Sequence, residues 1–378
     1  MKHLMIVSIV LLLAILLLAG CGGNGQPSGP PPLTYVTASA GASTPGGANA
    51  GKTVQLFPTS GQVSALAWSP DGKRLATAAG GSQGANFQVW DATTGQQLAS
   101  YGGQLTFPSC LAWSLDGTRI LSGGKPADST DLNNFRIWDA ATGKLLVEFG
   151  SRNVGAERIY LQGAAWSPDG SRIAASVAIY ADPTIVYPDE ALQIWDVATN
   201  RLLSTDPVAS SAPFQLLNAV AWSPDSKELA LSDGTSTVQI WDVTTSKLLL
   251  TYRGHTTPVQ PLAWSPDGRF LASASGYPEV QVWNPATGAL VFRYQGHTAG
   301  VDALAWSPDS KRIVSGSQSA GGIGEDHPIQ VWDAFTGQHP FYYAGLSSAT
   351  ALAWSPDGTR IASAGGATVQ VWQAPPES

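Results

Sequence analysis

Short apolar segments alternate with turn sequences between roughly residues 52 and 373, and this pattern recurs seven times. Each unit opens with a β-compatible apolar run that ends in Ala-Trp-Ser, as Val63 to Trp68 does. The turn sequence Ser-Pro-Asp-Gly follows in most units, with Pro presetting φ and Gly accepting a positive φ. Leu or Ile stands seven residues after every first tryptophan, so the second strand keeps one register. A tight hairpin is therefore predicted at the start of each unit.

Two tryptophans mark each unit and set its period. Successive first tryptophans are 42 to 56 residues apart, the period of a propeller blade or a helical repeat. The second tryptophan marks a third strand, Asp-x-x-Thr-Gly the next turn, and Gln97 to Tyr101 the fourth strand of the first unit. Short, turn-bounded alternation without a helical period indicates an all-β chain. The first tryptophans are Trp68, Trp113, Trp166, Trp222, Trp264, Trp306 and Trp354, and the second are Trp90, Trp138, Trp195, Trp241, Trp283, Trp332 and Trp372.

The residues of this unit resemble WD-repeat proteins. Gly-His, Ala-Trp-Ser-Pro-Asp-Gly, Val-Trp-Asp and Thr-Gly occur in this order, and the resemblance covers roughly residues 52 to 373. It implies a seven-bladed β-propeller of four-stranded antiparallel blades, which serves most often as a platform for partners and rarely as an enzyme. The last unit stops at Trp372-Gln373 without a fourth strand, whereas Lys52 to Phe57 is a strand without a partner. We expect this N-terminal strand to complete blade seven and remove an exposed edge.

Two segments precede the repeats, and five residues follow them. Residues 1–20 contain a 16-residue apolar stretch and fit a signal peptide better than a membrane span. The stretch ends in Leu18-Ala19-Gly20-Cys21, which is similar to a bacterial lipobox and implies lipidation of Cys21. The alternative is an ordinary signal peptide or an uncleaved anchor with an incidental cysteine. Residues 21–51 are rich in Gly, Pro, Ser and Thr and are expected to form a disordered tether with a reach of roughly 30 Å, and residues 374–378 a short tail.

Composition narrows the classes of function. The formal net charge is −7, and no basic patch suited to nucleic acid is found. If Cys21 is lipidated, only Cys110 remains, so no intramolecular disulfide can form, and Cys110 is expected to be a small buried hydrophobe. The lack of a thiolate cluster and of histidine ligand spacing leads us to expect no metal and no cofactor. A Ser-His-Asp triad can be assembled on paper, but no nucleophile elbow accompanies it.

Two histidines could suggest catalysis. The WD-repeat resemblance instead assigns each of them to a structural network with a serine of strand two, the tryptophan of strand three, and an Asp six residues before that tryptophan. Blade six matches this pattern throughout, whereas blade five has Tyr277 in place of the Asp, so its network is expected to be incomplete. The seven Asp of the Ser-Pro-Asp turns are likewise explained by backbone hydrogen bonding. The network residues are His255, Ser273 and Trp283 in blade five, and His297, Ser315, Asp326 and Trp332 in blade six.

The repeats differ in the lengths of their connections. The two tryptophans of a unit are 22, 25, 29, 19, 19, 26 and 18 residues apart, from unit one to unit seven. Because the first hairpin is constant, the extra residues are assigned to connections between strands two and three, roughly Lys125 to Asn134, Val177 to Ala191 and Gly316 to Pro328. Two further expansions, Gly150 to Gln162 and Ser204 to Leu217, lie between blades. All five are expected on one face, and loops on a rigid scaffold commonly carry binding.

Aromatic and charged residues in these expansions suit a protein or carbohydrate ligand. The alternative is tolerated surface insertion without a ligand, since long loops cost little stability. The candidate contacts are Tyr180, Asp182, Tyr187, Glu190, Arg152, Arg158, Tyr160 and Glu325.

The sequence favours a monomeric, non-catalytic scaffold that binds a protein partner and is lipid-anchored on the outer side of a bacterial membrane. Two alternatives remain open. One is an ectodomain that senses a glycan or a small ligand, and the other is a propeller hydrolase or quinone-dependent oxidoreductase.

Overall fold

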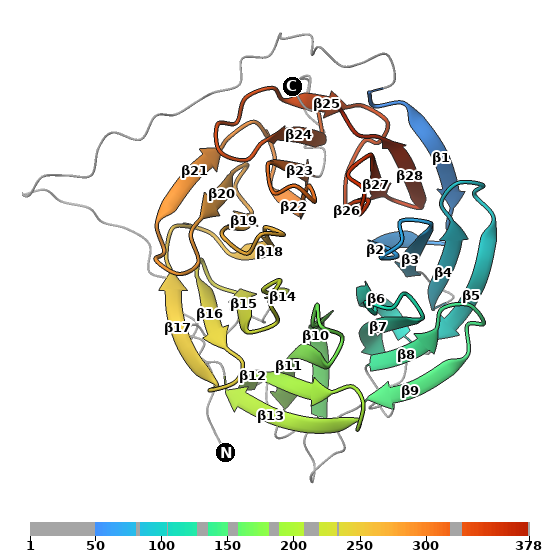
Figure 1. Cartoon of the computed structure of the whole chain (residues 1–378), viewed down its shortest axis with the longest axis vertical. Helices are drawn as coiled ribbons and strands as arrows, with labels where there is room; N and C mark the ends of the chain where they lie inside the picture. Colours follow the sequence, from blue (N-terminus) through green and yellow to red (C-terminus); the bar gives the residue numbers. More distant parts are fainter. Residues whose placement is uncertain are drawn as a thin grey trace, which may run out of the picture. The chain divides into compact units, whose positions relative to one another are not determined.

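The computed structural model describes a ring of seven β-sheets, each with four antiparallel strands (Figure 1). The described residues are 50–80, 84–103, 105–126, 135–149, 158–180, 189–207, 219–232, 234–317 and 327–376. They contain strands and turns but no helix, so no helix of sufficient length and apolarity to span a membrane is found in these ranges. The prediction of an all-β, seven-bladed propeller is confirmed.

Each blade is formed by strands that are consecutive in the chain, except blade seven. Blade one contains β2 (Gln62–Trp68), β3 (Arg74–Gly80), β4 (Ala85–Asp91) and β5 (Gln97–Gly103). Blade two contains β6 (Leu105–Trp113), β7 (Arg119–Pro126), β8 (Phe135–Asp139) and β9 (Leu145–Phe149). Blade three contains β10 (Arg158–Trp166), β11 (Arg172–Tyr180), β12 (Asp189–Asp196) and β13 (Arg201–Pro207). Blade four contains β14 (Ala219–Trp222), β15 (Glu228–Ser232), β16 (Val238–Asp242) and β17 (Lys247–Tyr252).

The remaining three blades follow the same order. Blade five contains β18 (Val259–Trp264), β19 (Leu271–Ser275), β20 (Val280–Trp283) and β21 (Leu290–Tyr294). Blade six contains β22 (Val301–Trp306), β23 (Arg312–Ser317), β24 (Ile329–Asp333) and β25 (Phe341–Tyr343). Blade seven contains β26 (Ala351–Trp354), β27 (Arg360–Gly365), β28 (Thr368–Gln373) and β1 (Thr53–Pro58). The first strand of each blade lies nearest the axis of the ring, and the fourth lies on its rim (Figure 1).

Strand β1 closes the ring. It pairs antiparallel with β28, so that Phe57 stands opposite Val369 and Leu56 opposite Gln370. The pairing gives blade seven its fourth strand and covers the edge of β28. The expectation that the N-terminal strand completes blade seven is confirmed.

The hydrophobic core lies between blades. Seven clusters of buried residues are present in the described part of the chain, and each combines residues of two neighbouring blades. In the cluster between blades seven and one, for example, Phe57 and Val371 pack with Val63 and Leu75. Alternation along each strand sends successive side chains to opposite faces of its sheet. Each blade therefore contributes to two clusters, and burial links all seven blades into one unit.

The strands on the rim share an irregularity that disturbs their outer edge. In six of them the register skips one residue near the beginning of the strand. The skipped residue is aliphatic, and 43 to 52% of its surface is exposed. A β-bulge interrupts the ladder and twists an edge strand, which hinders pairing with another chain. The skipped residues are Val54, Leu98, Leu146, Leu203, Leu249 and Val291.

Candidate functional site

Antiparallel strands turn back at alternate ends, so the connections of each blade are divided between two faces of the ring. We call the face with the Ser-Pro-Asp and Asp-x-x-Thr-Gly turns the short-turn face. We call the opposite face the long-loop face, where strand two connects to strand three and each blade connects to the next. The polar groups of the two faces are used in different ways.

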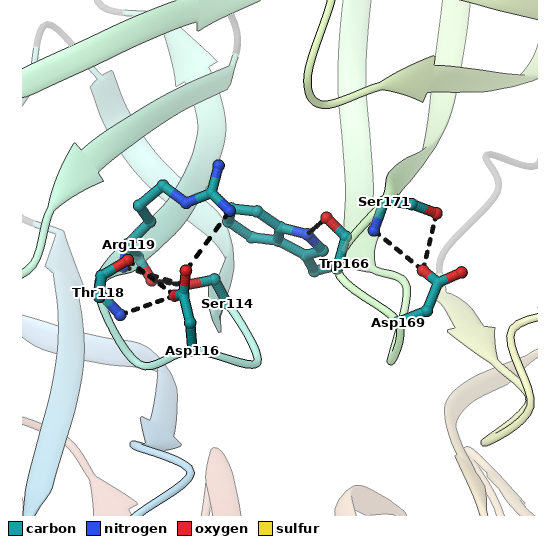
Figure 2. A network of polar contacts seen from close by, with 8 residues as sticks. Ser114, Asp116, Thr118, Arg119, Trp166, Asp169 and Ser171 are labelled. Atoms are coloured by element: carbon teal, nitrogen blue, oxygen red, sulfur yellow. Dashed lines mark hydrogen bonds and ion pairs between the residues drawn. The ribbon is translucent and has the colours of Figure 1, made fainter.

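On the short-turn face, the aspartates of the first hairpins are occupied within their own turns. In all seven blades the serine after the first tryptophan donates a hydrogen bond to Asp Oδ1 at 2.5 to 2.7 Å. In blade two, Thr118 also donates to Asp116 through its backbone N and its Oγ1 (Figure 2). These bonds, from Ser114 first and then from Thr118, hold the pKa of Asp116 at about 2. These carboxylates therefore organise turns, and their repetition has a structural explanation.

Arginines of the short-turn face bridge one blade to the next. The guanidinium of Arg119 lies over the ring of Trp166 in blade three, 5.3 Å from its centroid, and lies 3.8 Å from Asp116 (Figure 2). Arg74 lies over Trp113 in the same way and donates to the carbonyl oxygen of Gly117 at 2.8 Å. Cation–π contacts of this kind add to the packing between blades.

The first tryptophans also tie neighbouring blades together. In five blades the indole Nε1 donates to an alanine carbonyl oxygen of the preceding blade, at 3.0 to 3.2 Å. Trp166 is different, since its Nε1 donates to Gly170 in its own turn (Figure 2). Trp354 Nε1 has no hydrogen-bond partner among the described residues. Most polar groups on this side of the ring are thus committed to turns and to contacts between blades.

The two histidine networks have the hydrogen bonds expected of a structural role. His255 Nε2 lies 2.7 Å from Ser273 Oγ, which accepts a hydrogen bond from Trp283 Nε1 at 3.0 Å. In blade six His297 Nε2 lies 2.6 Å from Ser315 Oγ, which accepts a bond from Trp332 Nε1 at 3.0 Å. Each histidine is buried. The predicted fourth member in blade six, Asp326, lies outside the described residues.

In blade five a carboxylate comes from a different position than the pattern predicts. Glu279, two residues after Tyr277, places Oε1 3.9 Å from His255 Nδ1. It accepts hydrogen bonds from Gln281 Nε2 at 2.7 Å and from Arg293 at 2.8 Å. Burial lowers the pKa of His255 to about 4, against the opposing effect of the Glu279 charge. His255 is therefore neutral near pH 7. Tyr277, which stands where the pattern places the Asp, makes none of these network contacts.

On the long-loop face, the observed strands are longer than predicted and the loops are shorter. The tryptophan spacing predicts loops at 125–134, 177–191 and 316–328. Residues 125–126 instead lie in β7, 177–180 in β11, 189–191 in β12 and 316–317 in β23. The expansions between blades are shortened in the same way, because residues 158–162 lie in β10 and residues 204–207 in β13. Part of each insertion therefore lengthens a hairpin, where added residues pair their backbone groups with a neighbouring strand. This outcome was not visible in tryptophan spacing, which counts inserted residues without showing how they pair.

The predicted contact residues fall into two groups. Arg158 and Tyr160 lie in β10, Tyr180 in β11 and Glu190 in β12, and the backbone register places Arg158 opposite Tyr180. The strand register thus brings these four positions to the long-loop end of blade three. The other four, Arg152, Asp182, Tyr187 and Glu325, lie outside the described residues.

A ring of polar residues near the axis was missed by the sequence reasoning. The residue four positions before each first tryptophan is polar in every blade. In five blades this residue falls where the innermost strand skips register. Bulges re-aim side chains and are frequent beside functional sites. We call this set the axial polar ring, and it consists of Ser64, Ser109, Gln162, Asn218, Gln260, Asp302 and Thr350.

The described members of the axial polar ring lie in or directly before the innermost strands, toward the long-loop face, whereas Asn218 lies outside the described residues. Ser64, Ser109 and Gln260 are exposed. Two hydroxyls reach the next blade: Ser64 donates to the carbonyl oxygen of Pro108 at 2.7 Å, and Thr350 to that of Val63 at 2.8 Å. The sequence shows this set as a polar residue four positions before each first tryptophan. Comparing the lengths of the connections between strands does not detect it.

Tyr277 is a second feature of this face that sequence reasoning did not assign to binding. Its surface is 57% exposed. Among the exposed large hydrophobic residues of the described chain, it is the one with an aromatic side chain. It lies in the four-residue connection between β19 and β20, where Glu279 N donates to its carbonyl oxygen at 2.7 Å. A short connection with an internal backbone hydrogen bond restrains the backbone that carries this exposed aromatic residue, which lowers the entropic cost of binding.

Two further kinds of group bear on chemistry, the thiol of Cys110 and side chains that could bind a metal ion. Cys110 is buried, and burial raises the pKa of its thiol to about 12, so the thiolate is disfavoured at neutral pH. Within the described ranges, no group of His, Cys, Asp and Glu side chains is arranged to hold a metal ion.

Comparison with known families supports the type of repeat. Residues 51–91, 288–333 and 342–373 match the family model described as WD domain, G-beta repeat. Residues 159–305 match the model described as eukaryotic translation initiation factor eIF2A. Comparison with curated proteins gave no match. The chain thus combines WD-type repeats with a seven-bladed propeller, a fold that commonly serves as a scaffold for protein interactions and is generally non-catalytic.

Proposed function

We propose that this protein is a non-catalytic scaffold, held on the outer side of a bacterial membrane by a lipid on Cys21, that binds a protein partner through its long-loop face. The observation that carries the binding proposal is the difference between the two faces. The short-turn face commits its Asp, Arg and indole groups to turns and to contacts between blades. The long-loop face presents exposed members of the axial polar ring and the exposed ring of Tyr277.

The position of β1 supports the anchoring part of the proposal. This strand lies on the rim of blade seven (Figure 1), and the described chain begins at residue 50, just before this strand. A tether of about 30 residues with a reach of roughly 30 Å would let the long-loop face meet a partner near the membrane. The lipobox-like sequence before Cys21 supplies the attachment.

Anchoring is tested by changing Cys21 to Ser. The variant should be released from the membrane fraction and keep the melting temperature of the wild type, because Cys21 precedes the propeller. Mass spectrometry of the mature protein should show an acylated N-terminal cysteine. An unmodified Cys21, or an N-terminus elsewhere, would contradict this part of the proposal.

Partner binding is tested by crosslinking and capture of the anchored protein from its own membrane, followed by affinity measurement with the purified partner. Combined Tyr180→Ala and Tyr187→Ala should weaken binding by about 2 kcal/mol or more, since aromatic anchors dominate interfaces. Leu115→Ala is the matched control, because Leu115 is a large side chain, 64% exposed, in a short-turn connection. Equal loss in both variants, or no loss in the tyrosine variant when residues 181–188 are also shortened, would contradict the proposed face.

Thermal shift measurements on the same protein distinguish the glycan-sensing alternative from the scaffold proposal. A sugar, cation or peptidoglycan fragment that binds the folded state would raise the melting temperature in a thermal shift measurement.

A further inference from the structure

Acidic residues outnumber basic ones in the connections between strands two and three. The seven connections between strands two and three contain seven Asp or Glu residues and no Lys or Arg. In the first hairpins, by contrast, seven turn aspartates are accompanied by nine Lys or Arg at the two positions that follow each turn. Of these two sets, the connections between strands two and three hold the excess of acidic over basic residues. The acidic residues of these connections are Asp128, Asp131, Asp182, Asp233, Glu279, Glu325 and Asp326, of which Glu279 is among the residues that the structure describes.

At the seam between blades five and six, an exposed aromatic residue and a carboxylate each lie within two residues of the same backbone contact. Gly276, directly before Tyr277, meets Gly300, two residues before Asp302. A Cβ atom on Gly300 would lie 2.8 Å from the carbonyl oxygen of Gly276, so the two backbones are in contact. Tyr277 and Asp302 therefore stand on either side of one backbone contact, both on the long-loop face.

The polar side-chain contacts next to Tyr277 are made by Glu279. Arg293 Nη1 lies 2.8 Å from Glu279 Oε2, and this ion pair neutralises the charge nearest in sequence to Tyr277. Gln281 holds the other oxygen of Glu279. Tyr277 remains 57% exposed. Asp302 is half-buried at the bulge of β22, where it belongs to the axial polar ring.

We infer that the seam between blades five and six binds a Lys or Arg side chain of the protein partner, with the cation over the ring of Tyr277 and beside the carboxylate of Asp302. A cation is attracted to the face of an aromatic ring, and a nearby carboxylate adds a charged hydrogen-bond acceptor. The excess of acidic residues in the connections of the same face steers a basic segment toward it and repels an acidic one. The inference rests on the proposed binding face and names the chemistry of the partner.

The direct test uses the full chain with Cys21→Ser and a fluorescein-labelled peptide of alternating lysine and glycine, measured by anisotropy. We expect binding that weakens as salt rises, and that weakens about tenfold in Tyr277→Ala and in Asp302→Asn. Tyr277→Phe keeps the ring and should bind nearly as the wild type does. A peptide of alternating glutamate and glycine should not bind.

Asp242→Asn is the matched control for charge. Asp242 caps an Asp-x-x-Thr turn of the short-turn face, and blade five uses Asn284 at the equivalent position with the same backbone bonds. The control removes one negative charge from the opposite face and should change the lysine-peptide affinity less than about twofold. An equal effect of Asp242→Asn and Asp302→Asn, unchanged binding in Tyr277→Ala, or equal binding of the glutamate peptide would overturn the inference.

The same variants separate this inference from the proposed function. If the captured partner loses affinity in the Tyr180 and Tyr187 variant but not in Tyr277→Ala or Asp302→Asn, the face is correct and the cation site is wrong. If the lysine peptide responds to Tyr277 and Asp302 while the captured partner responds to neither face variant, the cation site stands and the proposed partner interaction fails.

Discussion

The phenol ring of Tyr294 lies parallel to the indole of Trp332 in the next blade, with ring centroids 4.1 Å apart and an angle of 3° between the planes. An aromatic residue on the rim contacts the second tryptophan of the next blade at six seams; the rings are stacked at four of them, tilted at one and edge-on at one. At the seam between blades three and four, Asp206 occupies the aromatic position and accepts a hydrogen bond from Ser246 at 3.0 Å. Aromatic contact thus accompanies aliphatic burial in joining most neighbouring blades.

Tyr294→Ala should destabilise the protein by about 3 to 5 kcal/mol, because it removes a buried aromatic side chain and leaves a cavity beside Trp332. Tyr294→Phe keeps the stack but loses the 2.6 Å hydrogen bond from Tyr294 to Gln330, and should cost about 1 to 2 kcal/mol. Urea unfolding followed by tryptophan fluorescence measures both. Equal costs for the two variants would show that stacking contributes little.

Serine at two turn positions combines an unfavourable backbone with a contact between blades. Ser310 has φ of 60° where most units have glycine, and its hydroxyl accepts a hydrogen bond from Asp267 N in blade five at 3.0 Å. Ser226 has φ of 61° and accepts from Asp169 N in blade three at 3.0 Å. The hydroxyl offsets a conformation that favours glycine.

We predict that Ser310→Ala is less stable than Ser310→Gly. Alanine keeps the strained φ and loses the hydrogen bond, for a cost of about 1 to 2 kcal/mol, whereas glycine relieves the strain and should be nearly neutral. Chemical unfolding of the two variants and the wild type gives the order. If alanine proved as stable as glycine, the positive φ would not be costly at this position.

The sequence predicted the repeated parts of this fold and failed where the repeats vary. Trp332 and Ser315 stand at fixed positions in their unit, so their hydrogen bond could be anticipated from one pattern. Glu279 could not be anticipated, because the pattern places the carboxylate at the position of Tyr277, and only the folded turn shows that Glu279 approaches His255. Tyr180 was assigned to a loop because an inserted residue has the same spacing whether it extends a hairpin or lies in a connection. The importance of Asp302 depends on the contact between Gly276 and Gly300, which joins different blades and leaves no local signal.

Acid should remove the stability that the ionised Asp116 contributes in its turn. The hydrogen bonds from Ser114 and Thr118 lower the pKa of Asp116 to about 2, below its ordinary value near 4. The stability that this group contributes is complete above its unfolded pKa and is lost as the pH falls from about 4 to about 2. We expect Asp116→Asn to lose stability less steeply than the wild type in this window. Melting temperatures between pH 5 and pH 2 measure the slopes, and identical slopes would contradict the assignment.

Strand β1 should be required for a closed ring. Removal of residues 22–50 should leave the melting temperature nearly unchanged, because this segment precedes β1. Extending the deletion through residue 58 removes Phe57, which is fully buried against blade one, and uncovers the edge of β28. The longer deletion should lower the melting temperature and promote aggregation. Light scattering and thermal unfolding compare the two proteins, and matching behaviour would argue against closure by β1.

Hydrogen–deuterium exchange of the protein with and without its captured partner tests the proposed face most directly. The partner should slow exchange in the connection Gly276–Glu279 and at the beginning of the innermost strands that carry Ser64 and Asp302, because these amides lie on the long-loop face. The turn from Ser114 to Thr118 should exchange at the same rate in both samples. Protection of that turn, with unchanged exchange at Gly276–Glu279, would contradict the account.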